Sequence, residues 1–331
     1  MKRVNLCILG CGSVARLHSR VARTLRGQVS LLFASRSRER AEKYKKAFRG
    51  IGAFGSYEEA CGHDSVDAVF ICTPHAHHLE HVRLAAAGGK ALLIEKPVAR
   101  SLEELSEIEK ATAEADVVSM VAENYYFKPL TRVLRYHIQR GDIGHPMFIE
   151  LKRVGRSKTS GWRTDAEMMG GGALLEGGIH WVNLMRSIGG EVKAVVAAKP
   201  QVPIKQVAPY EDSLELLFKF ADGSVGRLLH SWNLVNRIGG LSMSRVHGSN
   251  GNLFFESNGL FAIVAGIRKR FRIPGLIDIM GYRSMLGHFL ECVRDNRNPS
   301  MSLALARRDM QVVEAAYRSL ESGRFEGMAS P

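Results

Sequence analysis

The sequence lacks any apolar run long enough to cross a membrane. A transmembrane helix needs about 20 consecutive apolar residues, and no segment of the 331 residues approaches that length. Met1-Lys2-Arg3 leads into an apolar stretch from Val4 to Leu9, as in a signal peptide, but glycines interrupt the stretch and no small-residue cleavage site follows. We therefore expect a cytoplasmic protein with no membrane partner.

The chain also has few cysteines. Five cysteines at irregular spacings do not form a disulfide framework. Cys7 and Cys72 lie in strand-like runs, where a free thiol behaves as a small apolar residue. Cys7 and Cys11 have no second pair that would complete a metal site. The sequence predicts neither disulfides nor a bound metal.

Acidic residues are scarcer than basic ones, at 33 against 46, which gives a formal net charge of +13. The basic residues are spread along the chain, with one dense stretch from Arg36 to Arg49. A solvated basic surface and a field that attracts anionic cofactors or substrates both agree with this distribution. Because no element that reads nucleic acid is apparent, we expect no nucleic-acid partner.

The apolar content of 45% and the length suit a globular protein of two domains. The first 122 residues alternate strands and helices, which predicts a doubly wound parallel sheet of the Rossmann type. The expected strands are 4–9, 29–34, 66–72, 91–94 and 117–121, and the expected helices are 13–26, 38–48, 79–87 and 101–115. We assign this dinucleotide-binding domain to residues 1–122.

The pattern changes in residues 123–331, which we assign to a second, α/β domain for substrate binding and oligomerisation. Residues 192–264 consist mostly of strands with short turns, which predicts a mostly antiparallel sheet. Helices are expected near 129–140, 173–188, 281–295 and 303–322.

A dinucleotide fingerprint, G-x-G-x-x-A, follows the first expected strand. It comprises Gly10, Gly12, Ser13, Val14 and Ala15, with Cys11 at the first variable position. Glycines permit a tight turn and close approach of the pyrophosphate, and the helix N-terminus offers free N–H groups to the phosphates. The position of the motif between strand and helix predicts NAD(P) binding.

The end of the second strand bears on the choice between NAD and NADP. An acidic residue that would bind the ribose 2′-hydroxyl is missing there, and Ser35 and Arg36 stand in its place. A serine hydroxyl and a bidentate guanidinium suit a 2′-phosphate. We therefore expect NADP as the preferred cofactor, with NAD as the alternative.

Two further segments carry candidate catalytic side chains. Glu95-Lys96-Pro97 follows the fourth strand and brings Lys96 to the strand ends, where ligands of open α/β sheets bind. In a helix, Glu176 and His180 share one face, with Asn183 one turn beyond. A histidine with a carboxylate can move and orient a proton. Gly177 and Gly178 suggest that a nicotinamide or substrate approaches the helix backbone.

Together these pieces resemble the Gfo/Idh/MocA family, which includes glucose-fructose oxidoreductase and inositol dehydrogenase. The matching segments run in the family's order from the start of the chain past its middle. They are Gly10–Ala15, Thr73-Pro74 with His78, Glu95-Lys96-Pro97, Trp162-Arg163 and Gly170–His180, followed by the weaker Glu211-Asp212, Ser231-Trp232 and Gly248–Gly251.

The resemblance implies hydride transfer at a carbohydrate or polyol carbon, and a C-terminal domain whose large open sheet often forms the oligomer interface. It implies that Lys96 contacts the reacting oxygen, that His180 is the acid/base, and that Glu176 orients His180 or binds a neighbouring hydroxyl. Members commonly carry aspartate at the positions of Glu176 and Asn183, so this chain departs from the pattern twice.

The resemblance also assigns binding residues. Thr73, Pro74, His78 and Glu95 join the cofactor site, with His78 near the nicotinamide edge. Tyr125, Trp162, Arg163 and Asn183 join Lys96, Glu176 and His180 as substrate contacts. Packing at the domain junction is the alternative role of the segment Tyr125-Tyr126-Lys128, and anchoring of its loop is the alternative role of Arg163.

A dense histidine group spans residues 75–81. His77 and His81 have the i, i+4 spacing of helical metal ligands, but the nearby Glu80 falls on another part of the helix. We therefore assign no metal to this group.

The function expected from the sequence is NAD(P)-dependent oxidation or reduction of a small sugar, sugar derivative or cyclitol by a homo-oligomer, dimeric or tetrameric. The basic charge would favour an anionic substrate. A catalytically inactive ligand sensor that keeps the dinucleotide fold is the main alternative. An enzyme with tightly held cofactor and no net redox change is a third possibility.

Overall fold

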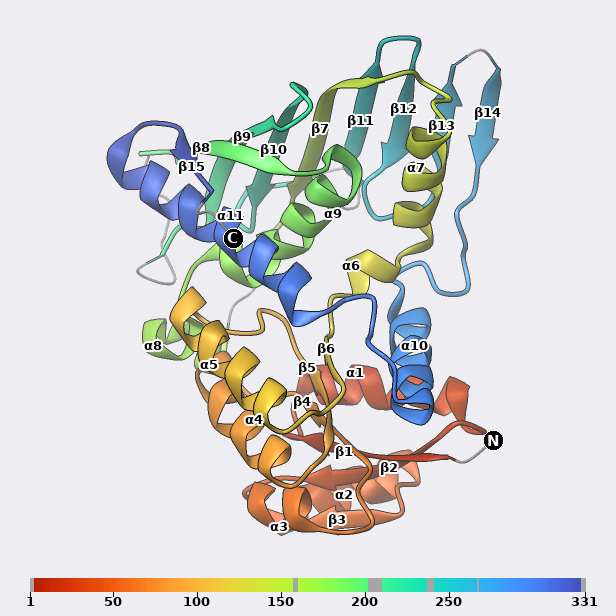
Figure 1. Ribbon diagram of the computed structural model, residues 1–331, viewed down its shortest axis with the longest axis vertical. Helices are drawn as coiled ribbons and strands as arrows, with labels where there is room; N and C mark the ends of the chain where they lie inside the picture. The colour runs from red at the N-terminus through yellow and green to blue at the C-terminus, as the bar shows by residue number, and fades with distance from the viewer. Residues whose placement is uncertain (1–2, 157–159, 202–209, 237–240, 267, 329–331) are drawn as a thin grey trace. The chain divides into compact units, whose positions relative to one another are not determined.

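The structure is a computed structural model, and it describes residues 3–156, 160–201, 210–236, 241–266 and 268–328 (Figure 1). Met1 and Lys2 and parts of the strand-rich region 192–264 fall outside these ranges. The chain forms two compact units. The first comprises Met1–Glu123 and Tyr282–Arg307, and the second comprises Asn124–Gly281 and Arg308–Pro331.

The first unit is built on a six-stranded sheet in the order β3-β2-β1-β4-β5-β6. Every pairing in this sheet is parallel, as the strand–helix alternation predicted. The strands are β1 Val4–Leu9, β2 Val29–Ala34, β3 Gly52–Phe54, β4 Ala68–Ile71, β5 Ala91–Ile94 and β6 Ser119–Val121. The central strands are almost continuously buried, because helices cover both faces of such a sheet.

Two helices of the first unit, α2 and α5, begin at capping serines. Ser37 accepts the amide of Arg40 at the start of α2, and Ser101 accepts the amide of Glu104 at the start of α5. The main helices are α1 Ser13–Ala22, α2 Arg38–Phe48, α4 His78–Ala87, α5 Leu102–Glu114 and α10 Tyr282–Asp295. A short turn of 3-10 helix, η1 Arg23–Leu25, continues α1.

Helix α10 belongs to the first unit although it follows the second in sequence. The ring of Tyr282 packs edge-on against His18 of α1, with 5.3 Å between ring centroids. The side chain of Arg294 donates to Gln28 beside β2. A single division of the chain after residue 122 therefore differs from the observed units by the segment Tyr282–Arg307.

Strand β3 and the following helix, α3 Tyr57–Gly62, were not predicted from the sequence. Strand β3 has only three residues, too few for a recognisable alternation. Ser56 accepts the amide of Glu59 at the start of α3, so a capping signal was present.

The second unit contains a nine-stranded sheet in the order β14-β13-β12-β11-β7-β10-β9-β8-β15. All its pairings are antiparallel except that of β10 with β7, which confirms the predicted mostly antiparallel sheet. The strands are β7 Pro146–Val154, β8 Val192–Ala198, β9 Ser213–Phe220, β10 Val225–Ser231, β11 Met243–Gly248, β12 Gly251–Glu256, β13 Ala262–Ala265, β14 Lys269–Arg272 and β15 Glu326–Gly327.

One face of this sheet packs against helices and the other is open (Figure 1). The helices of this unit are α6 Asn124–Phe127, α7 Pro129–Gln139, α8 Ala166–Met169 and α9 Ile179–Gly189, together with α11 Leu303–Ser322 from Arg308 onward. Strand residues that point toward the helices, such as Ile149 and Leu216, are fully buried. Their neighbours Phe148 and Leu217, which point the other way, are 52% and 38% exposed. The period-two alternation thus leaves apolar side chains on the open face.

Candidate functional site

The turn between β1 and α1 has the geometry of an anion cradle. Gly10 has a φ of +90°, and a Cβ there would lie 3.0 Å from the carbonyl oxygen of Cys72. A Cβ on Gly12 would meet no atom within 4 Å, so open space lies before the helix. Helix α1 has no side-chain cap and no acidic residue in its first turn. Its first N–H groups, which begin at Ser13, are therefore left for an anion.

Strand β2 and helix α2 hold this turn in place. The amide of Gly10 donates to Ala34 O at 3.0 Å, and the hydroxyl of Tyr44 donates to Gly12 O at 2.9 Å. Ala15, the last residue of the fingerprint, is fully buried and Val14 is half-buried. The turn is therefore fixed before any ligand arrives.

A cavity of about 440 Å³ lies beyond β2 and β4 and contains Arg36, Thr73 and Pro74 in its wall. Ser35 is buried, and its hydroxyl accepts the amide of Ser37 at 3.3 Å. Arg36 is exposed. The structure thus brings three of the predicted cofactor residues together around one cavity.

The same cavity has walls that the sequence analysis missed. They come from the unpredicted β3–α3 segment and from the start of α4, and they are Gly55, Ser56, Tyr57, Glu58, His77, Glu80 and His81. His81 Nδ1 lies 2.9 Å from Thr73 Oγ1, and burial lowers the pKa of His81 to about 4. The imidazole is therefore neutral at pH 7. Two carboxylates, Glu58 and Glu80, share the cavity with Arg36.

Within the histidine group, His78 is held by the backbone of the first unit. His78 is fully buried, with Nε2 3.1 Å from Thr73 O and Nδ1 3.3 Å from Val98 O. Burial holds the pKa of His78 below its ordinary value, so the ring is neutral and donates to one carbonyl at a time. Its ring nitrogens thus face the backbone. Across the described residues, no cluster of three or more possible metal ligands occurs.

Glu95 and Lys96 follow β5, and a buried contact with α1 holds Glu95. His18 Nε2 lies 2.7 Å from Glu95 Oε1, and the amide of Lys96 donates to Glu95 Oε2 at 3.1 Å. Burial alone would raise the pKa of Glu95, but the hydrogen bonds from His18 and the Lys96 amide and the charge of Lys96 outweigh it and lower the pKa. Glu95 is therefore an ionised anchor for the Lys96 backbone. The Lys96–Pro97 peptide bond is cis.

In the second unit, His180 stacks on Tyr125. The two ring centroids are 4.6 Å apart and the rings are 11° from parallel. The ammonium of Lys128 lies 4.1 Å from the centre of the Tyr125 ring, and both Tyr125 and Lys128 are buried. His180 is half-buried. The structure therefore brings two predicted substrate residues together and adds a buried cation to them.

Glu176 pairs with another predicted substrate residue. Arg163 Nε donates to Glu176 Oε1 at 2.7 Å, and the Arg163 guanidinium lies 4.3 Å from the centre of the Trp162 ring. The side chains of Arg163 and Glu176 remain 27% and 12% exposed. The Arg163 guanidinium thus orients the Glu176 carboxylate. From the sequence, only the family resemblance had grouped these two residues, as substrate contacts.

The helix that carries Glu176 and His180 is interrupted. Leu174–Gly178 form a π-turn, η4, and α9 begins at Ile179. π-turns inside helices are frequent at functional sites. A Cβ on Gly177 would lie 3.0 Å from Trp232 Nε1 and 3.3 Å from His230 Nε2. Side chains of β10 and the residue after it therefore crowd Gly177 within this unit, and the approach of a ligand to these glycines stays a prediction.

Glu211 fixes the start of this turn. Its Oε1 accepts the Leu174 amide at 2.9 Å and the Tyr317 hydroxyl at 3.1 Å. Burial raises the pKa of Glu211 in spite of these hydrogen bonds. A Cβ on Gly172 would lie only 2.4 Å from Glu211 O, so this glycine permits the close approach.

Asn183 lies in a buried polar cluster. Its amide Nδ2 donates to Asp309 Oδ2 at 2.8 Å, and Arg186 Nη1 donates to Asp309 Oδ1 at 2.5 Å. Asp309, on α11, is 2% exposed. The amide of Asn183 therefore faces a buried carboxylate of α11 that also pairs with Arg186.

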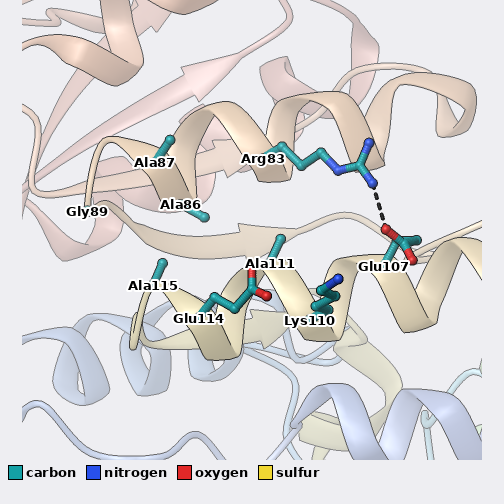
Figure 2. Close-up of a pocket in the computed structure, with 9 residues that line it drawn as sticks. All are labelled: Arg83, Ala86, Ala87, Gly89, Glu107, Lys110, Ala111, Glu114 and Ala115. Atoms are coloured by element: carbon teal, nitrogen blue, oxygen red, sulfur yellow. Dashed lines mark hydrogen bonds and ion pairs between the residues drawn. The ribbon is translucent and has the colours of Figure 1, made fainter.

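A cavity of about 670 Å³ in the first unit contains none of the predicted site residues. It lies between the C-terminal halves of α4 and α5, where Arg83 and Glu107 form an ion pair and alanines line the groove (Figure 2). Since β5 starts just after α4, this groove lies at the amino edge of the sheet, away from the fingerprint turn. Among the described residues, no helix is long and apolar enough to span a membrane.

Both halves of the chain match domain models of one family. Residues 4–123 match the Gfo/Idh/MocA model described as an oxidoreductase family with an NAD-binding Rossmann fold, and residues 131–254 match a Gfo/Idh/MocA C-terminal domain. The scyllo-inositol 2-dehydrogenase (NAD(+)) of Bacillus subtilis is 24% identical over 97% of this chain and 95% of its own length.

Two other similarities are informative. The D-xylose 1-dehydrogenase [NADP(+)] of Haloarcula marismortui is 32% identical over 40% of this chain. The matched part is 38% of that relative's length. The solved structure of a levoglucosan dehydrogenase in complex with NADH superposes with a TM-score of 0.90 over 100% of both chains at 20% identity. The fold is therefore shared along the whole chain.

Proposed function

Because the chain belongs to the Gfo/Idh/MocA family of oxidoreductases, we propose that it moves a hydride to or from a CH–OH carbon of a sugar, sugar derivative or cyclitol with a nicotinamide cofactor. The observation that carries the proposal is the uncapped N-terminus of α1, which opens onto free space at Gly12. The names of the three similar proteins, which act on D-xylose, scyllo-inositol and levoglucosan, support the substrate class.

The residues present fit a nicotinamide dinucleotide. The Gly10–Ala15 turn would hold the pyrophosphate, and the cavity beside Thr73 and Pro74 would hold the adenosine end. Arg36 and Ser35 favour NADP, because a guanidinium and a hydroxyl suit a 2′-phosphate. Glu58 and Glu80 in the same cavity oppose a phosphate by charge repulsion, so NAD stays the alternative.

When bound, the nicotinamide ring accepts or donates the hydride. In the oxidation direction, His180 takes the hydroxyl proton, and Lys96 stabilises the negative charge that develops on the oxygen. Glu95 positions Lys96 through its backbone amide. Glu176, held by Arg163, binds a neighbouring substrate hydroxyl. Tyr125 keeps the His180 ring in one plane, so that its nitrogens point in fixed directions.

We also propose a homo-oligomer, dimeric or tetrameric, that forms through the open face of the nine-stranded sheet. Exposed apolar side chains on that face, Phe148, Leu217 and Phe254, favour burial against a second copy. The proposed location is the cytoplasm, since all five cysteines are free.

The test uses the purified full chain. Fluorescence titration with NADPH and NADH measures binding, and a change in nicotinamide absorbance with D-xylose, scyllo-inositol or levoglucosan measures turnover. Turnover on any of these polyols supports the proposal. Tight dinucleotide binding without turnover on a wide sugar and cyclitol panel would instead favour the ligand sensor, and absence of dinucleotide binding would refute both.

A further inference from the structure

A second basic cavity lies in the first unit, at the amino edge of β1, β2 and β3. Its volume is about 260 Å³, and four arginines line it: Arg3, Arg23, Arg26 and Arg49. The rest of the lining is apolar except for the half-buried Ser30, and it consists of Ala22, Val29, Leu31, Phe48 and Ile51. No acidic residue is part of the lining.

The arginines come from three separate segments. Arg3 precedes β1, Arg23 and Arg26 lie in and just after η1, and Arg49 ends α2 with a φ of +56°. Cations are favourable at the C-terminal ends of helices, and this explains Arg23 at the end of α1 and Arg49 at the end of α2 individually. It does not account for Arg3, nor for the gathering of four like charges around one small space, which repel one another.

Their charge is not balanced nearby. Residues 1–38 contain eight lysines and arginines but no aspartate or glutamate. Over the part of the chain that the structure describes, none of the four guanidiniums forms an ion pair. Elsewhere in the same unit, arginines do find carboxylates, as Arg83 does with Glu107 at 2.7 Å. The cavity is therefore a concentrated and uncompensated positive site.

We propose that this cavity binds a compact anion with two or more phosphoryl groups. Guanidinium forks match phosphate oxygens bidentately, and four of them suit a ligand of high charge density. The volume of about 260 Å³ admits a diphosphate or triphosphate group but not a large ligand in full. The apolar residues of the lining can contact an organic substituent on the phosphate. Inorganic polyphosphates and nucleoside polyphosphates both present the phosphate groups that the arginines would bind.

This site is distinct from the β1–α1 turn, Gly10–Ala15, which we call the dinucleotide cradle. Arg3 precedes β1 and Gly10 follows it, so the six-residue strand separates the two sites by roughly 20 Å. The two can therefore be tested apart. A Cβ on Gly12 would meet no atom within 4 Å, so Gly12→Val places a side chain in the space before α1. This substitution should block the cradle while leaving the arginine cavity intact.

The test is isothermal titration of the full-length Gly12→Val protein with inorganic pyrophosphate, tripolyphosphate and ATP. We expect binding that weakens with rising salt, and about tenfold lower affinity in Gly12→Val proteins that also carry Arg23→Gln or Arg49→Gln. Arg132→Gln in the same background, an exposed arginine on α7 in the other unit, is the matched control and should change nothing. All three arginines are exposed, and a thermal melt of each variant verifies folding.

The probes separate the two sources of the ligand. Equal affinity for tripolyphosphate and ATP would show that the cavity recognises the phosphates alone. Tighter binding of ATP would show that the apolar lining also contacts the nucleoside. Both results support the proposed site. Loss of binding in Gly12→Val would overturn the proposal by placing the anion at the dinucleotide cradle. Citrate, an anion without phosphate, is titrated as a comparison. Citrate binding as tight as that of tripolyphosphate, or unchanged tripolyphosphate affinity in both arginine variants, would overturn the proposal as well.

Discussion

The buried contact between His18 and Glu95 permits a test of how the first unit holds Lys96. His18→Leu keeps an apolar side chain of similar size against Phe70, whose ring centroid lies 4.6 Å from that of His18, but it removes the hydrogen bond to Glu95. The side chains of His18 and Glu95 are only 2% and 12% exposed. Removal of one partner from a buried pair costs about 3–5 kcal/mol of unfolding free energy.

The pH dependence of this loss is specific. In the unmodified protein the pKa of Glu95 is lowered, so its ionised form stabilises the fold above the ordinary glutamate pKa of about 4.3, and that contribution is lost as pH falls through the folded pKa. Without His18, burial dominates and raises the pKa, so the carboxylate then destabilises the fold at neutral pH. The difference between the two proteins should therefore be largest near pH 7 and shrink by at least about 1 kcal/mol near pH 4.

Urea unfolding followed by circular dichroism at both pH values measures this difference. His145→Leu is the matched control, because His145 faces Asp222 at 3.7 Å with its side chain 57% exposed and should cost under about 1 kcal/mol. A loss in His18→Leu that is equal at both pH values would show that packing alone was removed. Our account of Glu95 as an ionised anchor would then be wrong.

Three other perturbations test the remaining assignments. Arg36→Ala should weaken NADP binding by about 1–3 kcal/mol and leave NAD binding nearly unchanged; equal weakening of both cofactors in calorimetry would contradict the preference. His180→Ala should lower kcat by roughly 10²–10⁴-fold and leave cofactor affinity unchanged. Lys96→Ala should lower kcat to a similar degree, and the two losses should not add in the double variant. Near-normal turnover of His180→Ala in steady-state kinetics would show that His180 is not the acid/base. Gly172→Ala should cost about 1–3 kcal/mol of stability, because the new methyl group would lie 2.4 Å from Glu211 O; an unchanged melting curve would show that this segment moves freely.

Local signals in the sequence were sufficient for most of the first unit. The β1–α1 turn, with Gly10 and Gly12, was predicted in place because glycine spacing and strand–helix alternation act over a few residues. The short strand β3 was missed, and with it the wall of the cavity beside Thr73 and Pro74 that contains Tyr57. Three residues, the first of them Gly52, do not show a period, and their strand conformation depends on pairing with β2.

The second unit shows where local reasoning ends. The i, i+4 spacing placed Glu176 and His180 on one helix, but the π-turn at Leu174–Gly178 changes the helical phase between them. The partner of Asn183 is Asp309, which lies 126 residues away in sequence. Contacts of this length depend on how α9 and α11 pack, and no pattern within one segment reveals them.

The return of α10 to the first unit bears on how such proteins are cut and recombined. A fragment that ends at Glu123 would lose Tyr282 from the surface of His18 and Arg294 from Gln28. It would expose apolar area that the intact chain covers, so we expect it to aggregate. Chimaeras that exchange cofactor preference between relatives must therefore transplant two stretches of sequence together, and a single splice point near residue 123 would join mismatched halves of one core.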